Sequence, residues 1–303
     1  MSTFALREIP LLSRSTLDRA EELRADARAL KEGWSAALLL RVTERGQVRL
    51  DGAELVLDKA ADFAAEPPEE AIFLGIVDGR HVWAVRSELE GRAGDLRMVG
   101  AKLDDASAGL VTTAVALLNW HASAGFSALD GSPTRPAKGG WSRISEATGH
   151  EEFPRTDPAI ICLVHDGGDR ALLARQHAWP ETMFSILAGF VEAGESLEHC
   201  VVREIREEVG LDVREVTYLG SQPWPFPRSV MIGFSAVADP DQPLRFADGE
   251  IAEAHWFTRT EIREALERGD WTAKRQADEQ PARLLLPGSI SIARGIVASW
   301  AMT

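Results

Sequence analysis

Three glutamates, Glu204, Glu207 and Glu208, lie at helical spacing in a stretch of mixed charged and apolar residues. At about 100° per residue, a helix would turn Glu204 and Glu208 toward its apolar stripe, with Glu207 beside it. That stripe consists of Leu197, Val201 and Ile205. Carboxylates this close to one another and to a core repel unless a cation neutralises them. Oxygen ligands at this spacing suit a hard divalent cation such as Mg²⁺ or Mn²⁺, and the alternative is a solvated acidic patch.

The segment that carries these glutamates has the features of one helix. Residues 196–208 contain neither Pro nor Gly. Gly210 can end a helix in the left-handed conformation. We therefore expect a helix from Ser196 to Glu208.

A longer pattern surrounds the glutamates. Residues 189–211 read GFVEAGESLEHCVVREIREEVGL, in which Gly189, Glu195 and the run 203–211 stand at fixed spacing. The stretch resembles the Nudix box, which marks enzymes that hydrolyse a nucleoside diphosphate linked to another group. A diphosphate needs its charge offset and water needs activation, and divalent ions do both.

The resemblance to the Nudix box implies a role for each charged residue. Glu204, Glu207 and Glu208 would hold the metal ions, and one of them would assist deprotonation of water. Arg203 would orient a box glutamate through a salt bridge. Glu195 matches a box position whose role we expect to be structural rather than catalytic.

A second motif follows the box. Residues 221–229 read SQPWPFPRS, and the prolines exclude a helix and a central strand while stiffening a segment with two aromatic rings. A rigid aromatic wall suits a flat base or a nicotinamide ring, and the alternative is a proline-rich turn packed on the core. The segment resembles the SQPWPFPxS element of the NADH pyrophosphatase family within the Nudix hydrolases. The resemblance implies that Gln222, Trp224, Phe226 and Ser229 bind substrate.

Four further positions match this family one at a time. Phe190 resembles the aromatic residue that stacks on a substrate ring, and Glu250 matches an outlying acidic metal ligand. Ser291 stands where the family places a small residue near the substrate. Phe153 stands where the family has a tyrosine, so stacking could survive but a hydroxyl contact could not. For Ser229, Ser291 and Phe153, packing or capping is the alternative to substrate contact.

The chain departs from the family at a metal site. Many members carry a zinc ribbon in which two C-x2-C pairs are separated by fourteen residues. The same four positions here are Ser127, Asp130, Ser145 and Thr148. Serine and threonine are poor zinc ligands, and one aspartate does not make a tetrahedral site. We therefore expect no structural zinc, with aromatic side chains helping to hold this region instead. The candidates are Trp120, Phe126 and Trp141.

Composition excludes several classes of protein. The net charge of −14 disfavours DNA as a partner, because phosphate neutralisation dominates nucleic-acid binding. No apolar stretch is long enough to cross a membrane, and the first residues lack the apolar run of a signal peptide. Cys162 and Cys200 lie among apolar residues and suit buried thiols in a reducing compartment. We expect a cytoplasmic protein without a membrane partner.

The elements that position these residues fall into three parts. We expect an α+β domain over 1–118, a degenerate zinc-ribbon-like connector over 119–155, and a Nudix α/β/α sandwich over 156–303. The expected helices are 17–30, 110–120, 196–208, 259–267 and 289–300. The expected strands are 36–42, 71–77, 81–85, 158–165, 171–176, 213–220, 229–238 and 254–257.

The pattern favours metal-dependent hydrolysis of NADH or NAD⁺ to nicotinamide mononucleotide and AMP. The family also removes NAD caps from RNA 5′ ends, so NAD-capped RNA is a further expected substrate. A homodimer is expected from the resemblance alone. Two alternatives stay open, a Nudix hydrolase of another dinucleotide such as ADP-ribose and a sensor that binds a nicotinamide nucleotide without turnover. The 221–229 element disfavours the first, and the three retained carboxylates disfavour the second.

Overall fold

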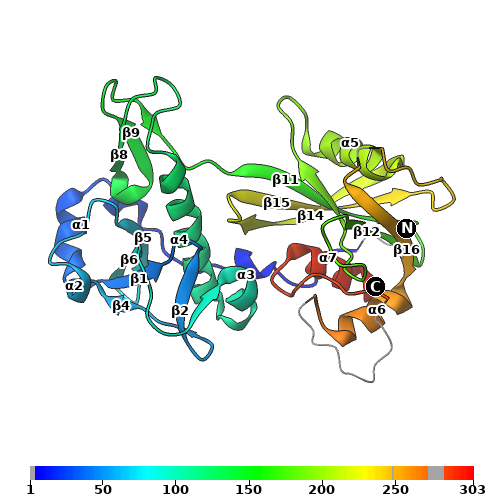
Figure 1. Ribbon diagram of the computed structural model, residues 1–303, viewed down its shortest axis with the longest axis horizontal. Coiled ribbons are helices and arrows are strands. Elements are labelled where there is room, and N and C mark those ends of the chain that lie inside the picture. Colours follow the sequence, from blue (N-terminus) through cyan, green and yellow to red (C-terminus); the bar gives the residue numbers. More distant parts are fainter. Residues whose placement is uncertain (1–3, 248, 272–282) are drawn as a thin grey trace. The chain divides into compact units, whose positions relative to one another are not determined.

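The chain divides into two units, shown in a computed structural model that describes residues 4–247, 249–271 and 283–303 (Figure 1). The N-terminal unit comprises Leu12–Thr156 and Pro223–Ser229. The C-terminal unit comprises Met1–Leu11, Asp157–Gln222 and Val230–Thr303. The domain limits expected from the sequence, 1–118, 119–155 and 156–303, remain a proposal.

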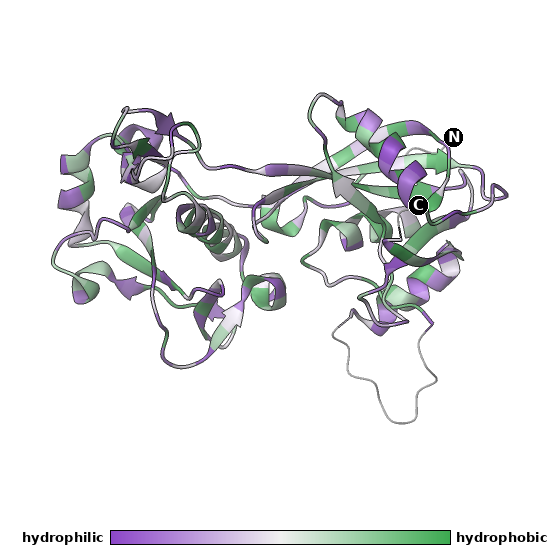
Figure 2. Ribbon diagram, turned by 45° about the horizontal axis from the view of Figure 1, so that its top comes forward, coloured by the Kyte–Doolittle hydropathy of each residue, from purple (hydrophilic) through white to green (hydrophobic). Residues whose placement is uncertain are grey.

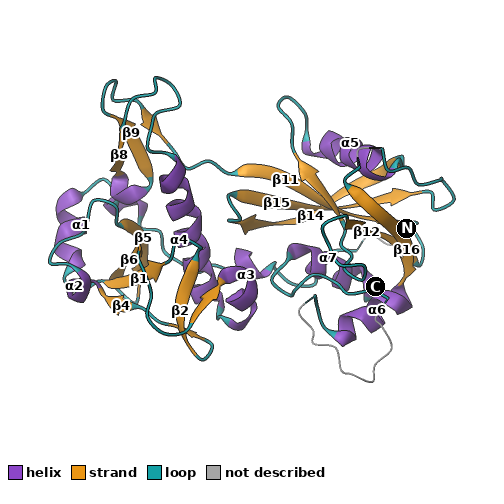
Figure 3. Ribbon diagram, in the orientation of Figure 1, coloured by secondary structure: helices purple, strands orange, loops and turns teal. Residues whose placement is uncertain are grey.

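The N-terminal unit is built on a seven-stranded sheet (Figure 3). Its main strands, in sheet order, are β3 (Glu54–Leu55), β2 (Gln47–Asp51), β1 (Leu38–Val42), β6 (Arg80–Arg86) and β5 (Ile72–Val77). Two short strands, β4 (Asp58–Lys59) and β7 (Ala93–Asp95), pair with β1 and β2. The helices are α1 (Ala27–Trp34), α2 (Ala60–Phe63), α3 (Leu96–Val99) and α4 (Asp105–Ser123). The three strands expected here are confirmed, and the helix expected at 110–120 is the longer α4.

The helix expected over 17–30 is wrong in its first half. Asp18 instead pairs with Ile76 of β5, whose N–H donates to the Asp18 carbonyl at 2.8 Å. Ala20 has a φ of 40°, which a continuous right-handed helix does not allow. The helix begins only after Asp26, whose carboxylate accepts two N–H bonds of the first turn. Pairing with the sheet and this cap therefore override the periodic pattern.

The connector folds into a small sheet with the strand order β10-β9-β8. Its strands are β8 (Thr134–Ala137), β9 (Ser142–Ser145) and β10 (Glu151–Glu152). Asp130 lies at the centre of its polar contacts. The Asp130 carboxylate accepts hydroxyl bonds from Ser132 at 2.5 Å, Ser145 at 3.0 Å and Thr148 at 2.8 Å. These bonds hold the pKa of the Asp130 carboxyl well below its usual range.

Hydrogen bonds thus connect three of the four positions where the related family has cysteines. The fourth position, Ser127, is connected to this network through its backbone. Its N–H donates to the carbonyl of Ser132, the residue whose hydroxyl bonds Asp130, at 2.8 Å. Hydroxyl groups that donate to one carboxylate do not fit zinc, which prefers thiolate and imidazole ligands. We infer that this network takes over the ordering role of the metal.

The three aromatic residues expected to hold the connector differ in burial and in contacts. Trp120 is buried, and the Trp141 indole donates to the Phe73 carbonyl at 2.6 Å. The Arg24 guanidinium lies 3.6 Å from the Trp141 ring centroid. Phe126 is 69% exposed, so the expectation that it anchors the connector is wrong. The hydrogen bonds of Asp130 hold the connector instead, and a pattern of apolar residues does not predict such bonds.

Replacing Asp130 by alanine is expected to lower the melting temperature by several degrees, because three hydroxyl donors lose their shared acceptor. Asp51→Ala, at an exposed strand end, is the matched control. Any loss of melting temperature in EDTA is expected to be restored by magnesium or manganese, the ions proposed for the box glutamates, without zinc. Differential scanning calorimetry measures both effects. A loss of stability in EDTA that zinc but not magnesium restores would contradict a metal-free connector.

The C-terminal unit is built on a six-stranded sheet. Its strands, in sheet order, are β14 (Val213–Trp224), β15 (Ser229–Ala238), β11 (Asp157–His165), β12 (Arg170–Gln176) and β16 (Ile251–Thr258), and β13 (Leu187–Phe190) pairs with β11. The helices are α5 (Leu197–Val209), α6 (Arg259–Arg268) and α7 (Ile292–Ala301). The elements expected here are confirmed. Because β14 lies at the end of the strand order, Pro223 falls on an edge strand, where a missing N–H is tolerated.

Helices cover both faces of this sheet (Figure 1). Successive side chains of a strand point to opposite faces. Along β11, Ile160 and Cys162 therefore pack in the core beneath α5, and Ile161 and Leu163 pack in the core beneath α6 and α7. In Figure 2 the strands are largely green and α5 carries purple bands, as expected of an amphipathic helix. The predicted α/β/α sandwich is confirmed.

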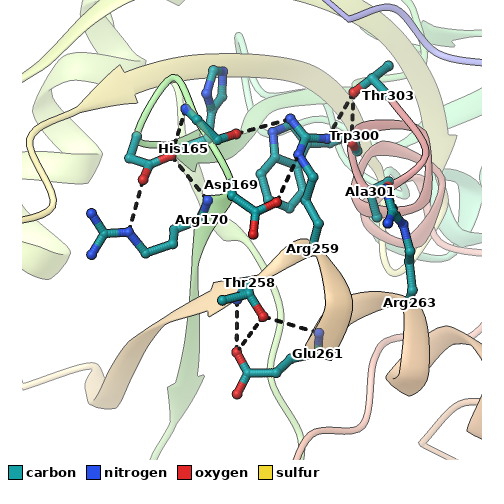
Figure 4. A network of polar contacts seen from close by, with 12 residues as sticks. His165, Asp169, Arg170, Thr258, Arg259, Glu261, Arg263, Trp300, Ala301 and Thr303 are labelled. Atoms are coloured by element: carbon teal, nitrogen blue, oxygen red, sulfur yellow. Dashed lines mark hydrogen bonds and ion pairs between the residues drawn. The ribbon is translucent and has the colours of Figure 1, made fainter.

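Two arginines of α6 hold the end of α7 (Figure 4). The Arg259 guanidinium donates to the Trp300 carbonyl and to the Thr303 hydroxyl, and it lies 4.0 Å from the Trp300 ring centroid. Arg263 donates to the Ala301 carbonyl at 2.6 Å. Terminal carbonyls of a helix lack partners within the helix, so these bonds satisfy them and fasten α7 to α6.

Candidate active site

The helix α5 is fixed at both ends by its own sequence. The Ser196 hydroxyl accepts a hydrogen bond from the His199 N–H at 3.2 Å. Gly210 has a φ of 74° and ends the helix in the left-handed region, where glycine is favoured. The bounds expected from the sequence are confirmed to within one residue.

The three box glutamates differ in exposure. Glu208 is buried at 3% exposure, while the side chain of Glu204 is 13% exposed and that of Glu207 is 53% exposed. Val201 and Ile205 on the same side of the helix are fully buried. The carboxylates therefore run from the edge of the core to solvent, as the helical spacing predicts.

Arg203 joins the helix to the loop before it. Its guanidinium donates to Glu204 and to Glu207, each at 3.0 Å, and to the Phe190 carbonyl at 2.9 Å. It also forms a two-pronged pair with Glu195, at 2.6 and 3.1 Å. Arg203 is thus placed to set the orientation of two box glutamates at once.

Glu195 is the anchor of this arginine. The hydrogen bonds from Arg203, together with one from the Glu192 N–H, lower the pKa of Glu195 to about 2. A carboxylate whose ionised form is stabilised by these partners is a weak base, poorly suited to accept a proton from water. The geometry supports the structural role expected for Glu195.

Gly189 has a packing reason to be glycine. A Cβ at this position would lie 1.9 Å from the carboxyl carbon of Glu204 and 2.0 Å from its Oε1. The Glu204 carboxylate therefore rests directly on the backbone of β13. Burial raises the pKa of Glu204. The Arg203 guanidinium partly offsets this rise, and the negative charges of Glu207 and Glu250 add to it.

Glu250 approaches this cluster from a different part of the chain, just before β16. Its charge acts on Glu204, and its Oε1 accepts a hydrogen bond from the Gln176 amide at 2.8 Å. Gln176 had no motif to mark it in the sequence, because its role depends on the pairing of β12 with β16. The structure thus places Glu250 where its charge acts on Glu204, and its role as a metal ligand stays a prediction.

The donor chemistry of this cluster fits a hard divalent cation. Within the described ranges, no three carboxylate, imidazole or thiol groups are already gathered closely enough to enclose an ion. The arrangement nevertheless puts carboxylate oxygens near one another, and the charged form of Glu204 is disfavoured by burial and by its acidic neighbours. A cation bound among them would relieve this repulsion, and oxygen donors suit Mg²⁺ or Mn²⁺.

The other candidate residues lie in varied environments. Phe190 is 59% exposed, beside Gly189. Phe153 is 56% exposed, with the Lys138 ammonium 5.4 Å from its ring centroid. Ser291 caps α7, since its hydroxyl accepts from the Ala293 N–H at 3.2 Å. Substrate contact by these three residues stays a prediction.

The 221–229 element is divided between the two units. Gln222 is fully buried, and its amide donates to the Ile290 carbonyl at 3.0 Å. Ser229 is buried at the start of β15. Trp224 and Phe226 lie in the N-terminal unit with their rings edge to face, 5.0 Å between centroids. Their predicted role as a wall for a substrate ring remains a proposal.

Two family descriptions match the chain. The NUDIX domain matches residues 155–279, and an NADH pyrophosphatase-like rudimentary NUDIX domain matches residues 33–120. The second match covers the sheet of the N-terminal unit, where the sequence shows no catalytic motif.

Several known proteins are similar to this chain. It is 60% identical over 307 residues to the NAD-capped RNA hydrolase NudC of Mycobacterium tuberculosis, covering 98% of this chain and 96% of that protein. It is 36% identical to the human mitochondrial NAD(P)H pyrophosphatase NUDT13, over 73% of this chain and 62% of that protein. Among solved structures, a NUDIX hydrolase from Nitrosomonas europaea has a TM-score of 0.39 at 20% identity, covering 53% of this chain and 97% of that one.

Proposed function

The chain belongs to the NADH pyrophosphatase family of Nudix hydrolases, and we propose that it hydrolyses the pyrophosphate of NADH and NAD⁺ to nicotinamide mononucleotide, reduced or oxidised, and AMP. The observation that carries this proposal is the 60% identity, over nearly the whole chain, to a protein named NAD-capped RNA hydrolase. The same relative supports NAD-capped RNA as a second substrate.

We assign the acidic residues of this cluster to metal binding and Arg203 to their orientation. Glu204, Glu207, Glu208 and Glu250 hold divalent ions, and Arg203 keeps Glu204 and Glu207 in position. When bound, the ions would offset the charge of the diphosphate and activate water. Phe190 offers its exposed ring to a substrate ring.

The remaining contacts with substrate are assigned by resemblance to the family. Trp224 and Phe226 supply an aromatic wall. Gln222, whose amide donates to the Ile290 carbonyl, is a further candidate for substrate contact. Ser229, Ser291 and Phe153 are secondary candidates, each with a packing or capping contact that explains it equally well.

Removal of divalent metal is expected to abolish NADH hydrolysis, because the clustered carboxylates then lack the ion that they would hold. The rate is measured by chromatography after dialysis against EDTA, and again after adding Mg²⁺ or Mn²⁺ in excess. Restoration by either ion supports the metal assignment and identifies the preferred metal. Full activity in the presence of EDTA would contradict it.

A substrate panel separates this function from its alternatives. The values of kcat/KM are measured for NADH, NAD⁺, NAD-capped RNA and ADP-ribose. We expect NADH, NAD⁺ or the capped RNA to exceed ADP-ribose, because ADP-ribose has no nicotinamide ring. A clear preference for ADP-ribose would favour a hydrolase of another dinucleotide. Tight binding of NADH without turnover would favour a sensor.

We also propose a homodimer in the cytoplasm. Family resemblance supports the dimer, which light scattering of the purified protein tests. Cys162 and Cys200 are buried free thiols, which supports a reducing compartment. Within the described part of the chain, no helix has the length and apolar character that crossing a membrane requires. The net charge of −14 argues against DNA as a partner.

A further inference from the structure

Asn119 donates hydrogen bonds to the proline-rich segment 223–229. Its amide nitrogen, on α4, donates to the Pro225 carbonyl and to the Pro227 carbonyl, both at 3.1 Å. Segment 223–229 and α4 belong to the same unit, so these bonds are internal to it. The prolines have no N–H of their own, which leaves the segment few local donors for its carbonyls.

Arg86 fixes the orientation of the Asn119 amide. Its guanidinium donates to the Asn119 Oδ1 at 2.6 Å and to the Thr43 carbonyl. Because arginine has donors and no acceptor, the amide oxygen must face Arg86. Both N–H groups of the amide then point toward the two proline carbonyls. The Asn119 amide therefore has one orientation that satisfies its oxygen and both of its N–H groups.

The two carbonyls flank Phe226. Holding both fixes the backbone on either side of this residue and so the direction of its ring. The ring lies edge to face with Trp224, and the Arg97 guanidinium lies 4.8 Å from its centroid. The Phe226 ring is therefore positioned by the restrained backbone on either side of it and by its contacts with Trp224 and Arg97.

We propose that Asn119 is a positioning residue for substrate binding, acting through Phe226. The proposal rests on the proposed function, in which Trp224 and Phe226 receive a ring of the substrate.

Asn119→Asp is the sharpest test, because it keeps the size of the side chain and its acceptor for Arg86 but replaces both donors by an oxygen. We expect KM for NADH to rise roughly tenfold, the effect of losing two hydrogen bonds, with kcat unchanged. Ser123→Ala, which removes a hydroxyl bond to the Trp120 carbonyl on the same helix, is the matched control and should change neither. If the Asn119→Asp protein does not fold, KM and kcat of Asn119→Ala are compared with those of Ser123→Ala instead.

A double-mutant cycle with Phe226→Ala decides whether Asn119 acts through that ring. In the Phe226→Ala background, Asn119→Asp should add no further rise in KM, because the ring that it positions is gone. Additive effects, or a fall in kcat with KM unchanged, would overturn the proposal. If Phe226→Ala itself leaves KM unchanged, the aromatic wall fails and the proposal falls with it. If the wild-type protein does not hydrolyse NADH, the proposed function fails first.

Discussion

Glu207→Gln is expected to lower kcat for NADH hydrolysis about 10³-fold, since a metal site contributes several kcal/mol of transition-state stabilisation and 1.36 kcal/mol corresponds to about tenfold in rate. The change removes one negative charge and keeps the size of the side chain. Glu207 is 53% exposed, so the substitution should not disturb the core. Steady-state kinetics by product chromatography, with calorimetry of the variant, separates lost chemistry from lost folding.

Glu208→Gln provides a second variant with a different environment, because Glu208 is buried. We expect a similar loss of kcat. The matched control is Glu198→Gln, at an exposed position in the first turn of the same helix, which should keep full activity. If Glu207→Gln and Glu208→Gln both remained as active as Glu198→Gln, the assignment of these glutamates to the metal site would be wrong.

Gly189→Ala is expected to lower kcat on the order of 100-fold, comparable to the effect of misplacing a catalytic group by about 1 Å. The new Cβ would lie 1.9 Å from the Glu204 carboxyl carbon, a distance that no packing tolerates. Because Glu204 is the flexible partner, its carboxylate must leave the position that Arg203 now holds. Kinetics of the variant at saturating metal, with its melting temperature, measures the consequence.

Gly295→Ala serves as control for a glycine-to-alanine change in the same unit. It lies within α7 and its Cβ would meet nothing within 4 Å. Alanine is the better helix former, so this variant should be fully active and slightly more stable. A Gly189→Ala protein with normal kcat would show that the position of Glu204 does not matter for the reaction.

Much of the site could be predicted because it is local in sequence. The helix bounds, the Gly210 end and the exposure order of Glu204, Glu207 and Glu208 all follow from helical geometry within one element. Glu250, more than forty residues away in the sequence, is marked as a candidate metal ligand by the family resemblance alone.

The parts that the sequence did not reveal depend on contacts between distant segments. Asp130 became the centre of a network only when hydroxyl groups on both sides of the ribbon came together. In the sequence, Asn119 is one polar residue in a largely apolar helix, and nothing there indicates its bonds to the Pro225 and Pro227 carbonyls. The false helix start near Asp18 has the same cause, because pairing with Ile76 overrides a local pattern.

Incubation of the wild-type protein with NADH and Mg²⁺ or Mn²⁺, followed by chromatography of the products, tests most directly whether the pyrophosphate is the bond that is broken. We expect equal amounts of AMP and reduced nicotinamide mononucleotide, and none when the metal is removed. Unchanged NADH, or release of nicotinamide together with ADP-ribose, would contradict hydrolysis at the pyrophosphate.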